Sequence, residues 1–200
     1  MIRTAPAALA LSLALGAAAF ANPVTHDPAK VPAGTYVLDK RHASLTAKLA
    51  HLGGFSRYTL RFGGLDGGFT YDPANWQATK LSFTVDPKSV DTGDAGFNKQ
   101  IAGYFHPDKY PAISFVSTAI TANEAGEGQV TGDLTFNGVT RPVTLNVTFN
   151  GEGPGLLGVG TRMGFSGTTR IKRSDFHESA VSQWAGDDVD LLFEVEFTKK

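Results

Sequence analysis

The chain has 200 residues, of which 42% are hydrophobic, and its formal net charge is −1. This length predicts one domain, and the near-neutral charge disfavours a general nucleic-acid binder, which usually carries an excess of Lys and Arg. Because the sequence contains no cysteine, disulfides, thiolate metal sites and cysteine nucleophiles are excluded.

The first 21 residues have the pattern of a secretory signal peptide. A short basic start, Met1–Arg3, precedes a run of Ala, Leu and Gly with one Ser, and residues 19–21 have the A-x-A form of a cleavage site. The run is shorter than the roughly 20 apolar residues of a membrane span. We therefore expect residues 1–21 to be removed after Ala21 and the mature protein to be exported.

Residues 22–33 hold three prolines among small and polar residues, which predicts a flexible lead-in to a domain spanning 34–200. From Gly34 onward, hydrophobic residues recur at every second position, as in half-buried strands. In the segment 42–51, Leu45, Ala47 and Leu49 share one face, and the other face is polar. The predicted strands are 42–51, 58–62, 65–71, 80–85, 112–118, 128–136, 143–149, 160–171 and 188–198.

Turn residues separate these strands. Asn137-Gly138 is a strong hairpin signal, because both residue types tolerate the positive φ that a short hairpin turn needs. Short alternating strands joined by such turns predict an all-β, antiparallel sandwich or barrel. The segment 94–105 differs, since Phe97, Ile101 and Phe105 recur every four residues. We expect a short helix there, lying over the sheet or the mouth of a barrel.

The sequence shows no recognisable catalytic constellation, and we predict neither enzyme activity nor a metal site nor a cofactor. The five histidines lack the spacing of a helical zinc site. The G-x-S-x-G elbow of hydrolases and a phosphate-binding glycine loop are also missing.

Six short motifs, in order along the chain, resemble those of one known family. They are Asp39 and His42 with His51-Leu52-Gly53, the stretch from Leu65 to Asp72-Pro73, Ser89-Val90-Asp91-Thr92-Gly93, the segment YFHPDKYPAISF at 104–115, the segment GDLTFNGVTRPV at 132–143, and IKRSDF at 171–176. Together they identify the chain as similar to the YceI-like, periplasmic polyisoprenoid-binding proteins. Ala47 departs from the pattern, where Phe is common, and so does His106, which replaces an Asp.

The resemblance implies a lipocalin-like, extended eight-stranded antiparallel barrel. Its interior would bind a long isoprenoid lipid of the polyprenyl phosphate or quinone type, taken up through transient contact with a membrane. The apolar residues that we expect to contact this lipid are Leu45, Ala47, Leu49, Phe83, Val85, Phe97, Ile101, Phe105, Phe115, Phe136, Leu145 and Phe165. Lys99, Arg141 and Arg173 are candidates to contact a phosphate head, with solvated surface positions as the alternative.

The inward-facing set mixes bulky side chains with the small residues Ala47, Ala112, Gly132 and Gly167, and such mixing predicts an open channel. Alternating small and large residues also suit a filled, tapering core. An exported stress or interaction protein with a filled barrel is therefore the alternative function, and an enzyme for an apolar substrate is a weaker one. The sequence leaves the oligomeric state open, a homodimer included.

Overall fold

The structure is a computed structural model that describes residues 24–123, 125–155 and 158–200, so the expected signal peptide at 1–21 lies outside the described residues. Its strands are β1 (Gly34–His51), β2 (Ser56–Phe62), β3 (Leu65–Tyr71), β4 (Ser82–Val85), β5 (Val90–Asp91), β6 (Ile113–Ala122), β7 (Glu127–Phe136), β8 (Val139–Pro154), β9 (Thr161–Lys172) and β10 (Ala185–Lys199). The helices are α1 (Ala95–Tyr104) and the short 3₁₀ turns η1 (Pro28–Lys30), η2 (Leu52–Gly54), η3 (Trp76–Ala78), η4 (Pro87–Ser89) and η6 (Arg173–Phe176). None of these helices has the length and hydropathy needed to cross a bilayer.

The strands form an antiparallel barrel, which confirms the predicted fold class. The sheet runs β10-β9-β8-β7-β6-β4-β3-β1, and pairing of β10 with β1 closes these eight strands into a ring. β2 and β5 extend the sheet beyond this ring, because β2 pairs with the second half of β1 and β5 pairs with β2. The very short β5 has no alternating pattern, and the sequence did not predict it.

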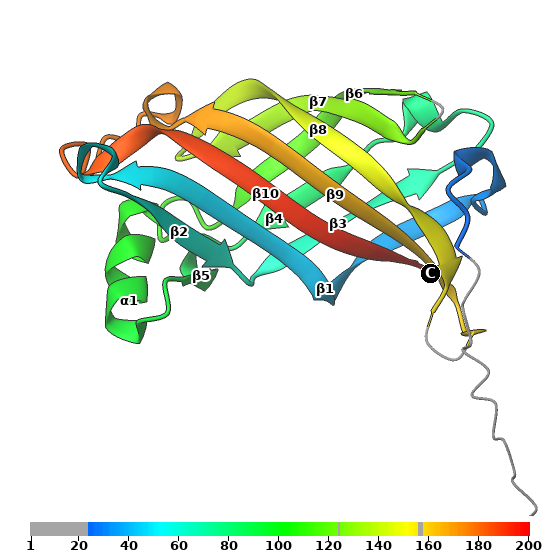
Figure 1. The fold of residues 1–200 in the computed structure, drawn as a ribbon, viewed down its shortest axis with the longest axis horizontal. Coiled ribbons are helices and arrows are strands. Elements are labelled where there is room, and N and C mark those ends of the chain that lie inside the picture. The colour runs from blue at the N-terminus through cyan, green and yellow to red at the C-terminus, as the bar shows by residue number, and fades with distance from the viewer. Residues whose placement is uncertain (1–23, 124, 156–157) are drawn as a thin grey trace, which may run out of the picture.

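The barrel is elongated, and its two ends are built from different elements (Figure 1). One end carries α1, the turn η2 and the connection from β9 to β10. The other end carries η1 and the connection between β6 and β7. The predicted helix at 94–105 is confirmed as α1, which begins after Asp94, whose side chain accepts a hydrogen bond from the Phe97 N–H at 2.8 Å. We refer below to the α1 end and the η1 end.

Alternation sorts the side chains of the strands between the barrel interior and the solvent, as the sequence predicts. On β10, the clearest case, Val189, Val195 and Phe197 are buried, whereas Asp188 is exposed. Predicted and observed strand ends differ by several residues at β1, β6 and β8: β1 already begins at Gly34, β6 continues to Ala122, and β8 spans Val139–Pro154. Backbone pairing, rather than side-chain polarity, therefore sets where these strands end.

Residues 24–33, which belong to the expected flexible lead-in, are packed against the barrel. Val31 is 1% exposed, and the hydroxyls of Tyr36 and Tyr71 donate hydrogen bonds to the backbone carbonyls of Pro32 and Pro28, at 2.8 and 2.9 Å. Burial raises the pKa of Tyr36 to about 12, so this hydroxyl remains a donor at any physiological pH. These contacts place the segment at the η1 end.

The hairpin between β7 and β8 supports the prediction made from Asn137-Gly138. The φ angles of these residues are 51° and 74°, and a Cβ placed on Gly138 would lie 2.5 Å from Cε1 of Tyr110. We therefore expect Gly138→Ala to lower the free energy of unfolding by about 1–3 kcal/mol, because it adds both backbone strain and a clash. Denaturant unfolding measures this loss. Gly103→Ala, where a Cβ meets no atom within 4 Å, is the control, and equal stability of both variants would contradict the argument.

Candidate functional site

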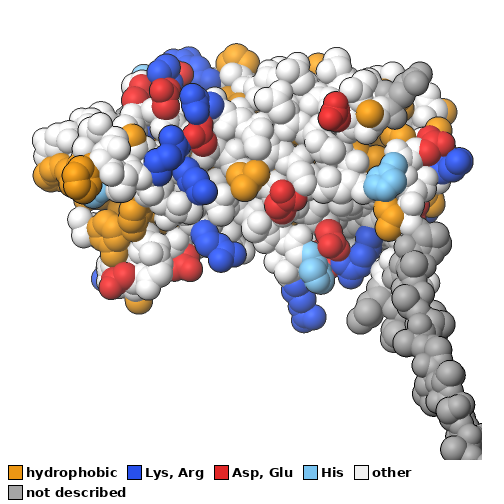
Figure 2. Space-filling view, viewed as in Figure 1, with side chains coloured by type: hydrophobic (Ala, Val, Ile, Leu, Met, Phe, Trp, Pro, Cys, Tyr) orange, Lys and Arg blue, Asp and Glu red, His pale blue; other side chains and the backbone are white. Residues whose placement is uncertain are grey.

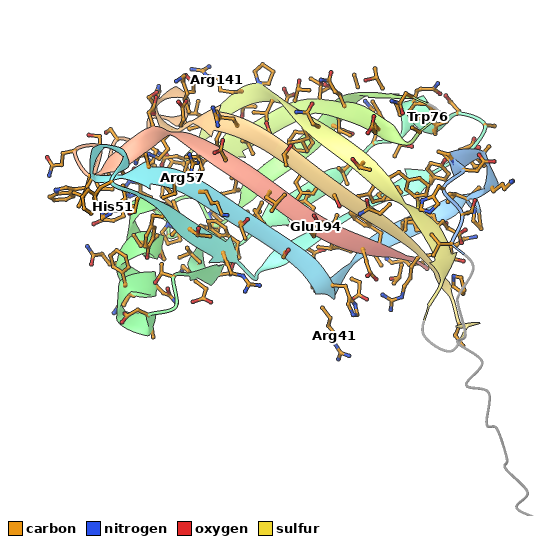
Figure 3. The ribbon with its side chains drawn as sticks, in the orientation of Figure 1. Arg41, His51, Arg57, Trp76, Arg141 and Glu194 are labelled. Carbon is orange, nitrogen blue, oxygen red and sulfur yellow. The ribbon has the colours of Figure 1, made fainter. Side chains whose placement is uncertain are left out.

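A large apolar cavity occupies the interior of the barrel. Its volume is about 890 Å³, near the upper end of the roughly 300–1,000 Å³ that small-molecule sites usually have. Its lining includes Trp76 toward the η1 end and His51 toward the α1 end, and Figure 3 shows these two residues at opposite ends of the molecule. The cavity therefore extends along the barrel, and a filled interior, the premise of the scaffold alternative, is not what the structure shows.

All twelve apolar residues selected from the sequence line this cavity. They are Leu45, Ala47, Leu49, Phe83, Val85, Phe97, Ile101, Phe105, Phe115, Phe136, Leu145 and Phe165. The alternation of β1, β4, β6, β7, β8 and β9 points nine of them inward, and the spacing along α1 and its C-cap brings Phe97, Ile101 and Phe105 to the wall at the α1 end. Whether they contact a lipid stays a prediction.

The small residues act differently from the expectation that they would leave space open. Gly132 and Gly167 are each covered by an aromatic ring: a Cβ on Gly132 would lie 2.5 Å from Cζ of Phe115, and one on Gly167 would lie 1.9 Å from Cζ of Phe193. These glycines, like Ala112, are not part of the cavity lining, whereas Ala47 is. The glycines thus allow two rings to lie flat against the barrel wall. The open volume of the cavity lies on the interior side of these rings.

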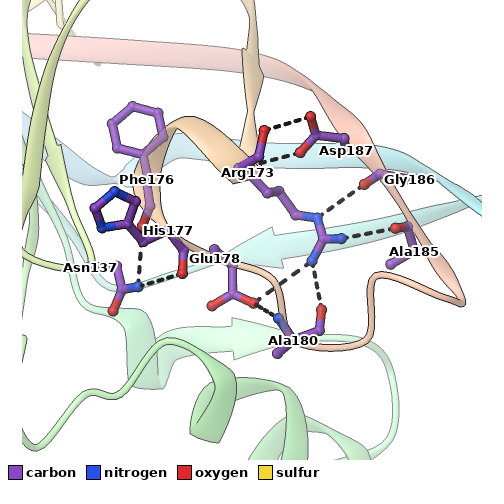
Figure 4. A network of polar contacts seen from close by, with 10 residues as sticks. Asn137, Arg173, Phe176, His177, Glu178, Ala180, Ala185, Gly186 and Asp187 are labelled. Atoms are coloured by element: carbon purple, nitrogen blue, oxygen red, sulfur yellow. Dashed lines mark hydrogen bonds and ion pairs between the residues drawn. The ribbon is translucent and has the colours of Figure 1, made fainter.

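A polar network closes part of the α1 end (Figure 4). Arg173 donates from Nε to the carbonyl of Gly186, from Nη1 to that of Ala180 and from Nη2 to that of Ala185, at 3.0, 2.9 and 2.9 Å. Its Nη1 also lies 3.8 Å from Oε1 of Glu178, whose side chain is 4% exposed. The guanidinium thereby fixes the connection between η6 and β10 across the barrel mouth.

Glu178 is a charged lining residue of this end that the sequence analysis missed. It follows η6 in a connection without periodicity, so no alternation signals that its side chain turns toward the cavity, which it lines. Burial raises the pKa of this carboxyl, and that effect exceeds the lowering by the Ala180 N–H and by the charges of Arg173 and His106. A buried acid at the mouth of an apolar cavity is therefore the most unusual electrostatic feature of the site.

The three basic candidates for a head-group contact lie in different environments. Lys99 is exposed on α1, and Arg141 is exposed on β8, where its Nε donates to the carbonyl of Asp175; neither lines the cavity. Figure 3 shows Arg141 on the outer surface. Arg173 does line the cavity, but its guanidinium is already bound to three carbonyls. The structure does not bring the three cations together.

Asp39, His42 and Glu196 place potential metal-ligating atoms within 4.8 Å of one another near the bulge of β1. Arg162 lies between the two carboxylates, and its Nη1 is 2.6 Å from Oδ2 of Asp39 and 2.9 Å from Oε2 of Glu196. The cluster is therefore an ion-pair network that ties the bulge to β9 and β10.

This network makes a specific pH prediction. The hydrogen bond with His42, followed by that from Arg162, lowers the pKa of Asp39 from 3.8 to about 2. The carboxylate therefore stabilises the fold fully above about pH 4, and this contribution is lost as the pH falls through 2. We expect Asp39→Asn to lower the free energy of unfolding by about 1 kcal/mol at pH 7, a value reduced for solvent screening. Denaturant unfolding at pH 7 and pH 2 should show the difference between the two proteins shrinking, and a constant difference would contradict the assignment.

Comparison with known proteins gives consistent matches over most of the chain. The YceI-like domain matches residues 36–197. A "UPF0312 protein" from Ectopseudomonas mendocina is 39% identical over 168 residues, which covers 82% of this chain and 87% of that protein.

Solved structures share the same architecture. The crystal structure of Burkholderia cenocepacia BcnA superimposes with a TM-score of 0.70 at 27% identity, covering 80% of this chain and 98% of that one. A polyisoprenoid-binding domain from Saccharophagus degradans, implicated in plant cell wall breakdown, gives a TM-score of 0.60 at 18% identity, with 82% and 98% covered. At that identity the second likeness concerns the fold alone.

Proposed function

This chain belongs to the YceI-like family, and from that premise we propose that it is a periplasmic carrier that holds a long isoprenoid lipid inside its barrel. The observation that carries the proposal is the apolar cavity of about 890 Å³ along the barrel. The signal-peptide pattern supports the location. The naming of the Saccharophagus degradans domain as polyisoprenoid binding agrees with the ligand class.

The energetics favour binding an extended hydrocarbon. Each CH₂ removed from water contributes roughly 0.8 kcal/mol, so a chain of about twenty carbons gains about 16 kcal/mol before the cost of association. A bilayer offers the lipid nearly the same gain, because the lipid tail is already out of water there. The net preference is therefore small, which suits a carrier that loads and unloads better than a permanent store.

Mass spectrometry of the natively purified protein tests this function. Organic extraction should release an isoprenoid in near-stoichiometric amount. Trp76 and Trp184, the two tryptophans of the chain, both line the cavity, and their fluorescence should change when a delipidated sample is titrated with an isoprenoid quinone. Protein that is empty on extraction and also unresponsive in the titration would refute the proposal.

A membrane contact at the α1 end would supply the lipid. Four large hydrophobic side chains are exposed there and form what we call the apolar rim: Leu52, Phe55, Phe97 and Trp184, with exposures of 52%, 91%, 39% and 50%. Figure 2 shows hydrophobic side chains gathered at the end of the molecule where Figure 1 places η2 and α1. Because Phe97 and Trp184 also line the cavity, the rim is continuous with the lipid's path, and a bilayer surface is the partner that its chemistry fits.

The rim predicts a kinetic effect that is separate from affinity. Leu52 and Phe55 do not line the cavity, so a Leu52→Ser, Phe55→Ser double variant should keep its affinity for lipid in detergent. It should extract lipid from phosphatidylcholine vesicles about tenfold more slowly, because less apolar surface enters the bilayer. Val159→Ser removes a side chain that is 74% exposed in the connection between β8 and β9, and it is the control. Equal transfer rates in all three proteins would place the contact elsewhere.

A further inference from the structure

The charges that line the cavity are few. Among the described lining residues, besides His51, the acidic and basic side chains are Asp27 at the η1 end and Arg173 and Glu178 at the α1 end. The described lining thus contains two carboxyl groups and one guanidinium, and no lysine is among the described lining residues. The carboxylate of Asp27 already has partners, since it caps η1 and lies 3.5 Å from Lys30 Nζ.

Arg173, the one Arg or Lys side chain among the described lining residues, is not available to a phosphate. Each nitrogen of the Arg173 guanidinium donates to a backbone carbonyl, and its charge is opposed by Glu178. A phosphate or diphosphate inside the cavity would need several charge-assisted donors to replace its hydration. It would instead meet a lining with more negative than positive charge, and the nearest exposed cation on α1, Lys99, lies outside the lining.

Glu178 itself offers an acceptor. Its hydrogen bond from the Ala180 N–H, at 2.8 Å, and its ion pair with Arg173 both use Oε1. In Figure 4 the other carboxylate oxygen carries none of the drawn contacts. Because the side chain lines the cavity, this oxygen is placed to accept a hydrogen bond from a hydroxyl group at the end of an apolar chain, and a hydrogen bond to a charged acceptor is stronger than one between neutral groups.

We propose that Glu178 selects the polar end of the bound lipid, and that this end is an uncharged hydroxyl-bearing head, as in a polyprenol or a reduced isoprenoid quinone, rather than a phosphate. The inference rests on the proposed function, since it concerns the same cavity. It replaces the sequence-based expectation that Lys99, Arg141 or Arg173 binds a phosphorylated head.

A comparison of ligands with matched tails tests the inference on the unaltered protein. Delipidated full-length mature protein is titrated in detergent with a polyprenol, the polyprenyl phosphate of equal chain length, a reduced isoprenoid quinone, and squalene, which has a tail and no head. We expect the polyprenol to bind about tenfold tighter than both its phosphate and squalene. Comparing the affinity for the reduced isoprenoid quinone with that for the polyprenol shows which of these two hydroxyl-bearing heads fits the site better.

The variant Glu178→Gln removes the charge and keeps an oxygen for the Ala180 N–H. It should bring the affinities for polyprenol and phosphate to within about threefold of each other. Asp133→Asn, which removes an exposed carboxylate outside the lining, is the matched control and should keep the preference.

Several outcomes overturn the inference. One is that the phosphate binds as tightly as the polyprenol, and another is that squalene binds equally well, since Glu178 then contributes nothing. Both leave the carrier function intact because the tail still binds. If none of the four ligands binds, the proposed function itself fails and takes this inference with it. An unchanged preference in folded Glu178→Gln protein would show that the preference arises elsewhere.

Discussion

Replacing Ala47 with Phe should reduce the affinity for an isoprenoid lipid at least tenfold and leave the protein folded. Ala47 lies near the middle of the second half of β1, opposite Leu191 of β10 and Leu60 of β2, and it is 5% exposed while lining the cavity. Because Ala47 lines the cavity, a phenyl ring at this position takes up cavity volume that bound lipid would otherwise occupy. Loss of the contacts of two or three CH₂ groups already costs about 2 kcal/mol, or more than a tenfold change in affinity.

The same strand provides the control for this prediction. Lys48 is the next residue, exposed on the outer face, so Lys48→Phe adds an identical ring to the outside of the barrel. Lipid titration by Trp fluorescence is suitable because neither substitution changes the number of tryptophans. If both variants bind lipid as the parent does, the ligand does not occupy this part of the barrel, and if only the thermal stability of Ala47→Phe falls, the position is filled by protein.

The strands and the lining residues were predictable because both depend on a period of two. Once alternation assigns Leu45, Ala47 and Leu49 to one face, closure of the sheet decides that this face is the interior. The residues of α1 were accessible in the same way, through their spacing of four. These predictions needed only the polarity of each residue and its place along its own element.

The shape of the cavity depends on which residues contact each other across neighbouring strands, and alternation along one strand does not determine these contacts. In the register of β6 and β7, Gly132 lies opposite Ser117, and the ring of Phe115 reaches over it diagonally. In the register of β9 and β10, Gly167 lies directly opposite Phe193. Composition suggested that the glycines leave gaps, whereas register places rings over them. Glu178 was hidden for a related reason, because a connection without regular structure has no periodicity from which the direction of a side chain follows.

Arg173→Met should be the most destabilising of the substitutions considered, with an expected loss of about 3 kcal/mol in the free energy of unfolding. The side chains of Arg173 and Glu178 are 12% and 4% exposed, so the variant leaves a buried carboxylate without its counter-ion and removes the donor from three carbonyls. Combining it with Glu178→Gln should recover about 1 kcal/mol, because the unpaired charge is then absent.

Arg141→Met, which removes an exposed guanidinium with one hydrogen bond, should cost less than about 1 kcal/mol. Denaturant unfolding of the unaltered protein, Arg173→Met, the double variant and Arg141→Met measures these differences. If Arg173→Met loses no more stability than Arg141→Met, the connection between η6 and β10 is held by its backbone contacts alone. A loss that is large but not relieved by Glu178→Gln would assign the effect to the three carbonyls instead of the buried charge.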